Sequence, residues 1–187
     1  MRIIGGSRRG LKLAEVGAGD AAAHLRPTSD RVRESIFNLL VNGGYGQPLA
    51  GARVLDLFAG TGALGLEALS RGASAVTFVE SGAVALGLLR RNIALMRAEP
   101  ACEIQRRDAT KPAPASAPHT LVFLDPPYGK RMGELALAAH AGWLAPGALV
   151  VWEESQPPQP PEGFTPLDQR RYGDTLITIL EAPCSRP

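Results

Sequence analysis

The feature that most constrains the fold is the stretch over 54–62, Val-Leu-Asp-Leu-Phe-Ala-Gly-Thr-Gly. Its apolar residues predict a buried strand over 53–57, and the residues that follow predict a helix over 62–70. Glycines at positions 60 and 62 permit a tight turn and let a ligand approach the backbone closely. A strand, a glycine turn and a helix in this order are typical of a ligand-binding unit in a parallel sheet.

The alternation of strands and helices continues along the chain. We predict strands over 75–80, 102–107, 121–124 and 148–152, helices over 82–97 and 131–141, and a loop over 111–118. Two final strands, over 164–171 and 175–181, are joined by Gly173-Asp174 and predict an antiparallel hairpin. The sequence therefore predicts an α/β, Rossmann-like fold with a seven-stranded, mostly parallel sheet that ends in this hairpin.

The N-terminal part of the chain differs from this pattern. Residues 1–25 are basic and glycine-containing, and short strands over 2–4 and 11–13 predict a small hairpin. A helix is expected over 28–41, because Val32, Ile36, Leu39 and Leu40 recur at helical spacing. We expect one domain over 1–187, in which residues 1–25 extend a core over 26–187.

Composition excludes several classes of protein. No apolar run reaches the length of a membrane span, and the N-terminus lacks the apolar region of a signal peptide, so we expect a cytoplasmic protein. Cys102 and Cys184 have no metal-ligand spacing and are expected to be reduced thiols. The net charge of +2 identifies no partner by itself, although basic residues form local clusters.

Acidic residues at the ends of three predicted strands suit a cationic ligand. Asp56 precedes the glycine turn, where it would repel a phosphate but could hold a positively charged amino group. Glu80 ends the next strand, where a carboxylate can accept hydrogen bonds from two ribose hydroxyls. Asp108 ends the third, where it could contact an adenine amino group or simply pair with Arg106 or Arg107. This arrangement indicates a site for S-adenosylmethionine, because the helix N-terminus also suits its carboxylate.

A second motif, Asp125-Pro126-Pro127-Tyr128, follows the strand over 121–124. An exocyclic amino group on a base is a poor nucleophile, because its lone pair is delocalised into the ring. The Asp125 side chain and the Pro126 carbonyl could accept its N–H groups and direct the lone pair at a methyl donor. The prolines fix the backbone, and Tyr128 offers a flat face on which a base can stack. Alone, the motif could be a plain turn; with the glycine turn, it indicates methylation of a base amino group without a metal.

At these residues the chain resembles the RsmD-type bacterial 16S ribosomal RNA guanine-N2 methyltransferases. The resemblance covers nearly the whole chain and rests on Met1 to Gly10, Arg26 to Asn38, Asp56 to Arg71, Phe78 to Glu80, Asn92, Asp108-Ala109 and Asp125 to Tyr128. It implies the class I methyltransferase fold. It also implies methylation of the N2 amino group of one guanine in 16S rRNA, with S-adenosylmethionine as cofactor.

The resemblance also implies roles for individual residues. Cofactor binding is implied for Thr28, Asp56, Phe58, Gly60, Gly62, Glu80, Asp108 and Ala109. Base positioning in catalysis is implied for Asp125, Pro126 and Tyr128. The segment over 26–34 is implied to pack over the cofactor, and the N-terminal hairpin to help hold RNA.

A guanine in a helix must leave the base stack before its N2 can react, so the substrate base is expected to be unpaired or flipped. We expect the backbone phosphates near the Tyr128 pocket to be held by Arg8, Arg9, Lys12, Lys130 and Arg131. The expected partner is 16S rRNA in the small ribosomal subunit or its assembly intermediate, and the protein is expected to be a monomer.

Three other functions fit parts of the same pattern. A methyltransferase acting on adenine N6 or cytosine N4 could use the same motif, because the amino-group chemistry is shared. Methylation of a glutamine amide in a protein poses a similar chemical problem. A non-catalytic, RNA-binding ribosome assembly factor could keep the fold without turnover, although the intact motif at Asp125 to Tyr128 argues against it.

Overall fold

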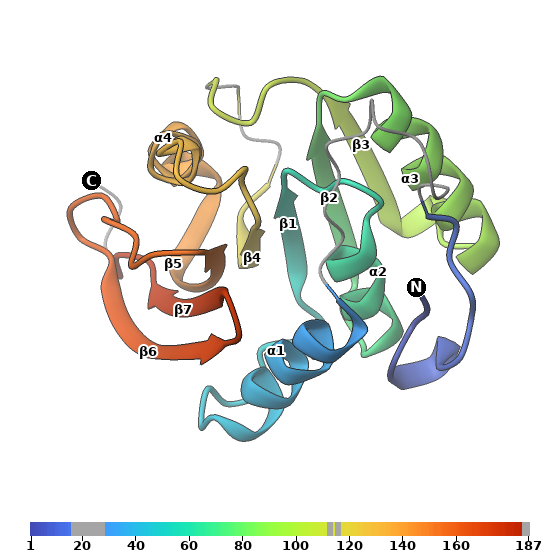
Figure 1. The fold of residues 1–187 in the computed structure, drawn as a ribbon, viewed down its shortest axis with the longest axis horizontal. Coiled ribbons are helices and arrows are strands. Elements are labelled where there is room, and N and C mark those ends of the chain that lie inside the picture. The colour runs from blue at the N-terminus through green and yellow to red at the C-terminus, as the bar shows by residue number, and fades with distance from the viewer. Residues whose placement is uncertain (16–28, 112–113, 115–116, 185–187) are drawn as a thin grey trace.

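A seven-stranded sheet forms the centre of the computed structural model, which describes residues 1–15, 29–111, 114 and 117–184. The strand order is β3-β2-β1-β4-β5-β7-β6 (Figure 1). The strands are β1 (Arg53–Leu57), β2 (Ala75–Glu80), β3 (Cys102–Arg106), β4 (His119–Leu124), β5 (Leu144–Glu154), β6 (Thr165–Tyr172) and β7 (Thr175–Glu181). β1 to β5 pair in parallel, whereas β7 is antiparallel to both β5 and β6. The predicted sheet and its C-terminal hairpin are confirmed.

Helices cover both faces of the sheet. They are α1 (Asp30–Asn42), α2 (Ala63–Ser70), α3 (Ala83–Met96) and α4 (Met132–Ala139), with short 3₁₀ turns η1 (Gly6–Arg8), η2 (Glu99–Ala101) and η3 (Ala141–Trp143). Apolar residues of α1, α2 and α3 share one buried cluster with Val54, and those of α4 and η3 share another with Leu55. Because neighbouring residues of a strand point to opposite faces, β1 contributes to both layers.

The N-terminal cap of α1 follows from its local sequence. The Ser29 hydroxyl accepts the N–H of Val32 at 3.2 Å, and Asp30 places a negative charge in the first turn. The helix then buries Ile36, Phe37 and Leu40 against the sheet. In the described ranges, no helix is long and apolar enough to span a bilayer.

Several predicted elements differ in the structure. In place of the expected strands over 2–4 and 11–13, these segments form one antiparallel bridge, between Arg2 and Lys12, flanked by a few backbone hydrogen bonds, and η1 lies in the turn between them. β5 begins at Leu144, ahead of the predicted 148–152, since His119 pairs with Leu144 before a register shift in the ladder. The predicted helix over 131–141 ends earlier, and η3 follows it.

The N-terminal segment lies along α2 (Figure 1). At its tip, the backbone N–H of Arg8 donates to the Ser70 hydroxyl at 2.9 Å, at the end of α2. At its open end, the backbone of Ala14 exchanges two hydrogen bonds with the Asn92 side chain, which also donates to the carbonyl of Thr61 at 2.9 Å. The tip therefore lies at the amino edge of the sheet, and the open end lies near the glycine turn at the carboxyl edge.

A fully buried carboxylate, Glu67 of α2, anchors this segment. Its two oxygens accept the backbone N–H groups of Ile4 at 2.7 Å and Gly5 at 2.8 Å. Arg71 donates to it at 2.7 Å, and the buried Arg33 of α1 lies 3.9 Å away. A charge removed from water is tolerated only where such donors surround it, so Glu67 joins three segments in one network.

We predict that Glu67→Gln lowers the free energy of unfolding by about 3–5 kcal/mol, because it removes the buried negative charge that faces Arg71 and the buried Arg33, which then keeps only its ion pair with Asp30. Urea denaturation of the wild type and the variant measures this loss. The matched control is Glu34→Gln, an exposed acid of α1, which should stay within about 0.5 kcal/mol of the wild type. Equal losses in the two variants would show that the network contributes no stability.

Candidate functional site

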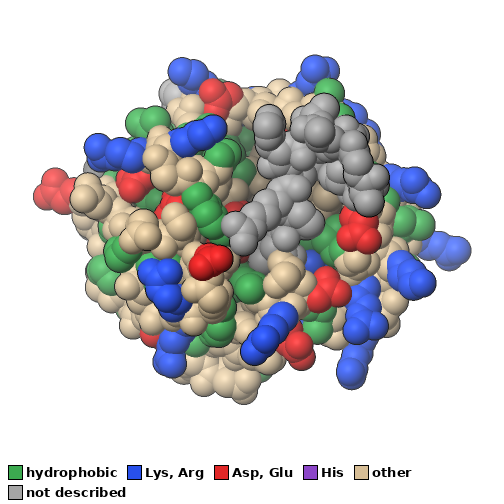
Figure 2. Space-filling model, viewed as in Figure 1, with side chains coloured by type: hydrophobic (Ala, Val, Ile, Leu, Met, Phe, Trp, Pro, Cys, Tyr) green, Lys and Arg blue, Asp and Glu red, His purple; other side chains and the backbone are tan. Residues whose placement is uncertain are grey.

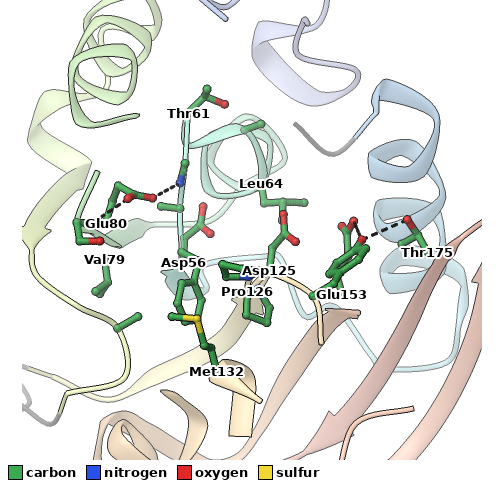
Figure 3. A pocket seen from close by; sticks show the side chains of 18 of the residues that line it. Asp56, Thr61, Leu64, Val79, Glu80, Asp125, Pro126, Met132, Glu153 and Thr175 are labelled. Atoms are coloured by element: carbon green, nitrogen blue, oxygen red, sulfur yellow. Dashed lines mark hydrogen bonds between the residues drawn. The ribbon is translucent and has the colours of Figure 1, made fainter. Parts of the chain in front are cut away.

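A cavity of about 830 Å³ opens at the carboxyl edge of the sheet. Residues at or just after the carboxyl ends of β1 to β5 line it, so both sequence motifs face the same space. Figure 3 shows Asp56 and Glu80 on one side of it, Glu153 and Thr175 on the other, and Asp125 with Pro126 between them. The volume falls within the range of small-molecule sites, and the carboxyl edge is where ligands bind in parallel sheets.

The glycine turn after β1 is tightly folded. Phe58 and Gly60 line the cavity and have positive φ angles of 60° and 55°. A non-glycine residue with positive φ is uncommon and is often found at a functional site. Gly62 does not line the cavity; at φ 79° it starts α2, where a Cβ atom would lie 2.4 Å from Leu89. The two predicted glycines therefore have different positions: Gly60 faces the cavity, and Gly62 allows close packing against Leu89.

Asp56 lies at the base of the cavity and is only 2% exposed. Its Oδ2 atom accepts the backbone N–H of Gly65, in the first turn of α2, at 2.9 Å. Burial raises the pKa of this carboxyl to about 8, and the negative charge of Glu80 adds to the rise, while the Gly65 N–H opposes it. A cationic group entering the cavity would favour the ionised form.

The Glu80 carboxylate closes the glycine turn onto the end of β2. Oε2 accepts the N–H of Gly60 at 2.8 Å, and Oε1 accepts those of Ser81 at 2.8 Å and Gly82 at 2.6 Å. The sequence indicated Glu80 only as a partner of ribose hydroxyls and did not indicate that it also holds the glycine turn. A carboxylate has about four acceptor positions, so Glu80 can hold the loop and still accept a ligand hydroxyl.

The end of β3 provides another part of the wall. Ala109 is buried, while Asp108 is exposed and accepts the N–H and hydroxyl of Thr110 at 2.8 and 2.7 Å. These bonds, the hydroxyl first, lower the pKa of Asp108. Arg107 does not pair with Asp108: it faces the Trp143 ring, and its terminal nitrogens are buried without a hydrogen-bond partner. Sequence reasoning considered Arg107 only as a partner of Asp108 and did not place it in the site.

Thr28, the remaining predicted cofactor residue, lies outside the described residues. Its neighbour Ser29 and Val32 of α1 line the cavity. The start of α1 thus reaches the site. These two residues belong to the 26–34 segment, of which the structure describes residues 29–34.

The Asp125 to Tyr128 motif follows β4 directly. Pro126 is buried, Asp125 and Tyr128 are half-buried, and all three line the cavity. The Tyr128 hydroxyl donates to Oε1 of Glu153 at 2.7 Å. Burial raises the pKa of the Tyr128 hydroxyl. The hydrogen bond with Thr175 opposes this rise, whereas the hydrogen bond to Glu153 and the negative charges of Glu153 and Asp125 add to it. The three residues predicted to position a base therefore line the same cavity, and the hydrogen bond to Glu153 holds the Tyr128 side chain in place.

Sequence reasoning missed the opposite wall, formed by Glu153, Tyr172, Asp174 and Thr175. The antiparallel course of β6 and β7 brings the turn at 173–174 back to the carboxyl edge of β5. Two acids, Glu153 and Glu154, end β5 at this edge and are both buried. Their adjacent placement at a strand end was a visible signal, although the pairing of the hairpin was not.

The five predicted phosphate contacts do not gather around Tyr128. Lys130 and Arg131 are exposed directly after the motif, between Tyr128 and Met132, which both line the cavity. Arg8 and Arg9, by contrast, lie at the tip of the N-terminal segment beside the end of α2, at the amino edge, and Lys12 pairs with Arg2. In Figure 2, Lys and Arg side chains are spread around one face with acids between them, not gathered into one patch. The expected closeness of Arg8 and Arg9 to Tyr128 is thus not seen.

Asp56 generates a prediction about pH. An unfolded aspartate has a pKa of about 3.9, while folding raises that of Asp56 to about 8. The folded state binds the proton more tightly, so this group's contribution to stability is complete below about pH 4 and is lost as the pH rises to about 8. Asp56→Asn cannot ionise and can still accept the Gly65 N–H.

We therefore expect the free energy of unfolding to decrease less between about pH 5 and pH 8 in Asp56→Asn than in the wild type. Urea denaturation at both pH values measures the difference. Asp174→Asn, an exposed acid at the cavity rim, is the control and should follow the wild type. Parallel pH profiles for wild type and Asp56→Asn would contradict the role of Asp56.

Known proteins resemble this chain along most of its length. The family model described as Conserved hypothetical protein 95 matches residues 1–181. Ribosomal RNA small subunit methyltransferase D of Escherichia coli K12 is 41% identical over 155 residues, which cover 82% of this chain and 74% of that protein.

Solved structures agree with this match. The protein yhhF of Escherichia coli has a TM-score of 0.81 and 31% identity, with 99% of both chains covered. An RNA methyltransferase from Salinibacter ruber, solved with S-adenosyl-L-homocysteine, shares the fold with a TM-score of 0.61 at 16% identity, over 86% of this chain and 96% of that one. With a class I methyltransferase fold, two motifs on one cavity and a family model that spans nearly every residue, this chain belongs to the RsmD family.

Proposed function

We propose that this protein transfers a methyl group from S-adenosylmethionine to the exocyclic N2 of one guanine in 16S rRNA of the small ribosomal subunit. The observation that carries the proposal is a single cavity that joins the acidic strand ends at Asp56 and Glu80 to the Asp125 to Tyr128 motif. The related Escherichia coli protein is named for methylation of small-subunit ribosomal RNA. Such a substrate would place the activity in the cytoplasm.

The residues of the cavity fit the cofactor. Asp56 and Glu80 give one end a negative character, which suits a molecule that carries a sulfonium and an ammonium group. The positive φ angle of Gly60 brings backbone to the cavity wall, and Ala109 provides a buried apolar surface for a flat ring. Phe58, Glu80 and Asp108 complete the residues that would hold it. When bound, the cofactor supplies an electrophilic methyl group, so the protein needs no covalent intermediate.

The protein's own task is to prepare the nucleophile. Asp125 accepts one N–H of the amino group and the Pro126 carbonyl accepts the other, which turns the nitrogen lone pair toward the methyl donor. Tyr128, held by Glu153, stacks on the base and fixes the plane in which these bonds form. Holding both reactants in one orientation lowers the entropic part of the barrier. Asp125 need not be a strong base, because the amino proton becomes acidic only as methyl transfer proceeds.

The experiment that tests this function uses radiolabelled S-adenosylmethionine and small ribosomal subunits from cells that lack the protein. We expect label in N2-methylguanosine after digestion to nucleosides. Asp125→Ala should lower the rate by about 100-fold or more, since it removes an oriented acceptor from the transition state, whereas Asp125→Asn keeps an acceptor and should lose less. The control Asp168→Ala changes an acid of β6 that does not line the described cavity and should leave the rate unchanged.

Each outcome of this assay decides between functions. Label in a different nucleoside would overturn the assignment to guanine N2 and retain the cofactor. An absence of label on subunits, free rRNA and DNA, despite measurable cofactor binding, would favour the non-catalytic RNA-binding function.

The charge distribution generates a separate prediction about RNA affinity. Lys130 and Arg131, directly after the Asp125 to Tyr128 motif, and Arg8 and Arg9, at the tip of the N-terminal segment, are each proposed to contact phosphates. Removing one such contact lowers the slope of log affinity against log salt by about 0.7–0.9. We expect the double variant Lys130→Ala/Arg131→Ala, and separately Arg8→Ala/Arg9→Ala, to bind 16S rRNA more weakly and with a lower salt slope. A pair whose removal leaves affinity and slope unchanged makes no phosphate contact.

A further inference from the structure

We propose that Glu153 determines the choice of base: its buried carboxylate accepts the N1–H of guanine beside the reactive amino group. This inference rests on the proposed function, because it assigns the second acceptor for the base that Asp125 holds. Neither sequence motif includes Glu153. This residue belongs to β5, and the pairing of β5 with β4 brings it to the site.

The register of the sheet places Glu153 next to Asp125. Leu124 of β4 pairs with Trp152 of β5 in parallel, so the two acids come directly after a registered pair. Neighbouring strands lie about 4.8 Å apart, and registered residues point to the same face. Both side chains line the cavity, on the same side of Asp56 in Figure 3. The two carboxylates are thus adjacent at the place where the base must lie.

The surroundings of Glu153 hold its carboxylate in a fixed position. It is 6% exposed, and the Tyr128 hydroxyl donates to its Oε1 at 2.7 Å, with the Thr175 hydroxyl 3.4 Å from that same hydroxyl. The residue that offers a stacking face to the base is therefore bonded to the acid. A carboxylate oxygen can accept more than one hydrogen bond, so the bond to Tyr128 is compatible with a bond to the base.

The chemistry of the bases explains what a second acceptor would select. In guanine, the N2 amino group is next to N1–H, which makes a row of donors. In adenine and cytosine, the reactive amino group is next to a ring nitrogen that carries a lone pair. Two adjacent carboxylates match the donors of guanine, whereas Glu153 would face the lone pair of the other bases without a hydrogen bond. A buried acceptor left in this state costs free energy, and a site built on such bonds discriminates strongly.

The test uses small subunits reconstituted with 16S rRNA that carries either guanine or 2-aminopurine at the labelled position. 2-Aminopurine keeps the N2 amino group but has a lone pair at N1. We expect the wild type to prefer guanine by about 10- to 100-fold in kcat/KM. In Glu153→Gln, the amide oxygen can still accept the Tyr128 hydroxyl and the amide nitrogen can donate to N1, so this preference should fall at least tenfold.

Two controls separate this effect from a general disturbance of the site. Glu154→Gln changes the next residue, whose carboxylate accepts the Gly129 N–H at 3.2 Å and the Ser155 N–H at 2.8 Å, and its preference for guanine should equal that of the wild type. Filter-binding affinity of each variant for the two subunits gives a readout independent of turnover and should show the same change in preference. Melting temperature reports whether each variant folds.

The outcomes are decisive in each case. A Glu153→Gln preference equal to that of the wild type would mean that Glu153 only positions Tyr128, which overturns the inference. If Glu153→Gln does not fold, the test is the wild-type preference for guanine over 2-aminopurine, and a preference below tenfold overturns the inference. Failure of the proposed function is distinguishable, because wild-type protein would then form no N2-methylguanosine on guanine subunits at all.

Discussion

In β1, β4 and β5, the parallel register brings Asp56, Asp125 and Glu153 to one edge of the sheet and onto one face. Asp56, Asp125 and Glu153 each come two residues after a buried apolar residue: Val54, Phe123 and Val151, respectively. Residues two apart in a strand point to the same face, so the acids lie on the face that packs against α1, α2 and α3. The apolar residues therefore fix where the acids point, because a slip of one residue would turn every side chain to the other face. The site depends on this register as much as the core does.

Carboxylates held close together in a half-enclosed cavity repel one another, and burial adds to the cost. The protein offsets this cost with specific donors: the Gly65 N–H for Asp56, three backbone N–H groups for Glu80 and the Tyr128 hydroxyl for Glu153. The raised pKa of Asp56 shows that its donor compensates only in part. A cationic cofactor and a base rich in N–H donors would supply the remaining compensation, so the electrostatics of these carboxylates favour the ligands proposed for the cavity.

The N-terminal segment is tied to this edge through the protein interior. Glu67 holds its first turn against α2, and Asn92 joins Ala14 to the carbonyl of Thr61 in the glycine turn. Both side chains are fully buried. A segment that the sequence marks only as basic thus has a second task, because its backbone supports the turn that lines the cavity. Its cationic tip is directed away from the cavity, which separates any contact with RNA at Arg8 and Arg9 from the base-binding region.

The sequence alone determined the order of strands and helices, the glycine turn with Asp56, and the Asp125 to Tyr128 motif, because these depend on local periodicity and on the chemistry of a few adjacent residues. It also placed Glu80 at the end of its strand, where the structure has it, whereas Asp108 lies two residues beyond Arg106, where β3 ends. Tertiary structure alone decided which residues from distant segments meet: Glu153 beside Asp125, Thr175 beside Tyr128, and Arg107 inside the wall and not paired with Asp108. It also separated Arg8 and Arg9 from the pocket to which their position in the sequence had assigned them. The physical reason is that local pattern fixes which face of an element is buried, whereas strand pairing and helix packing, which join residues far apart in the chain, fix which buried faces share a cavity.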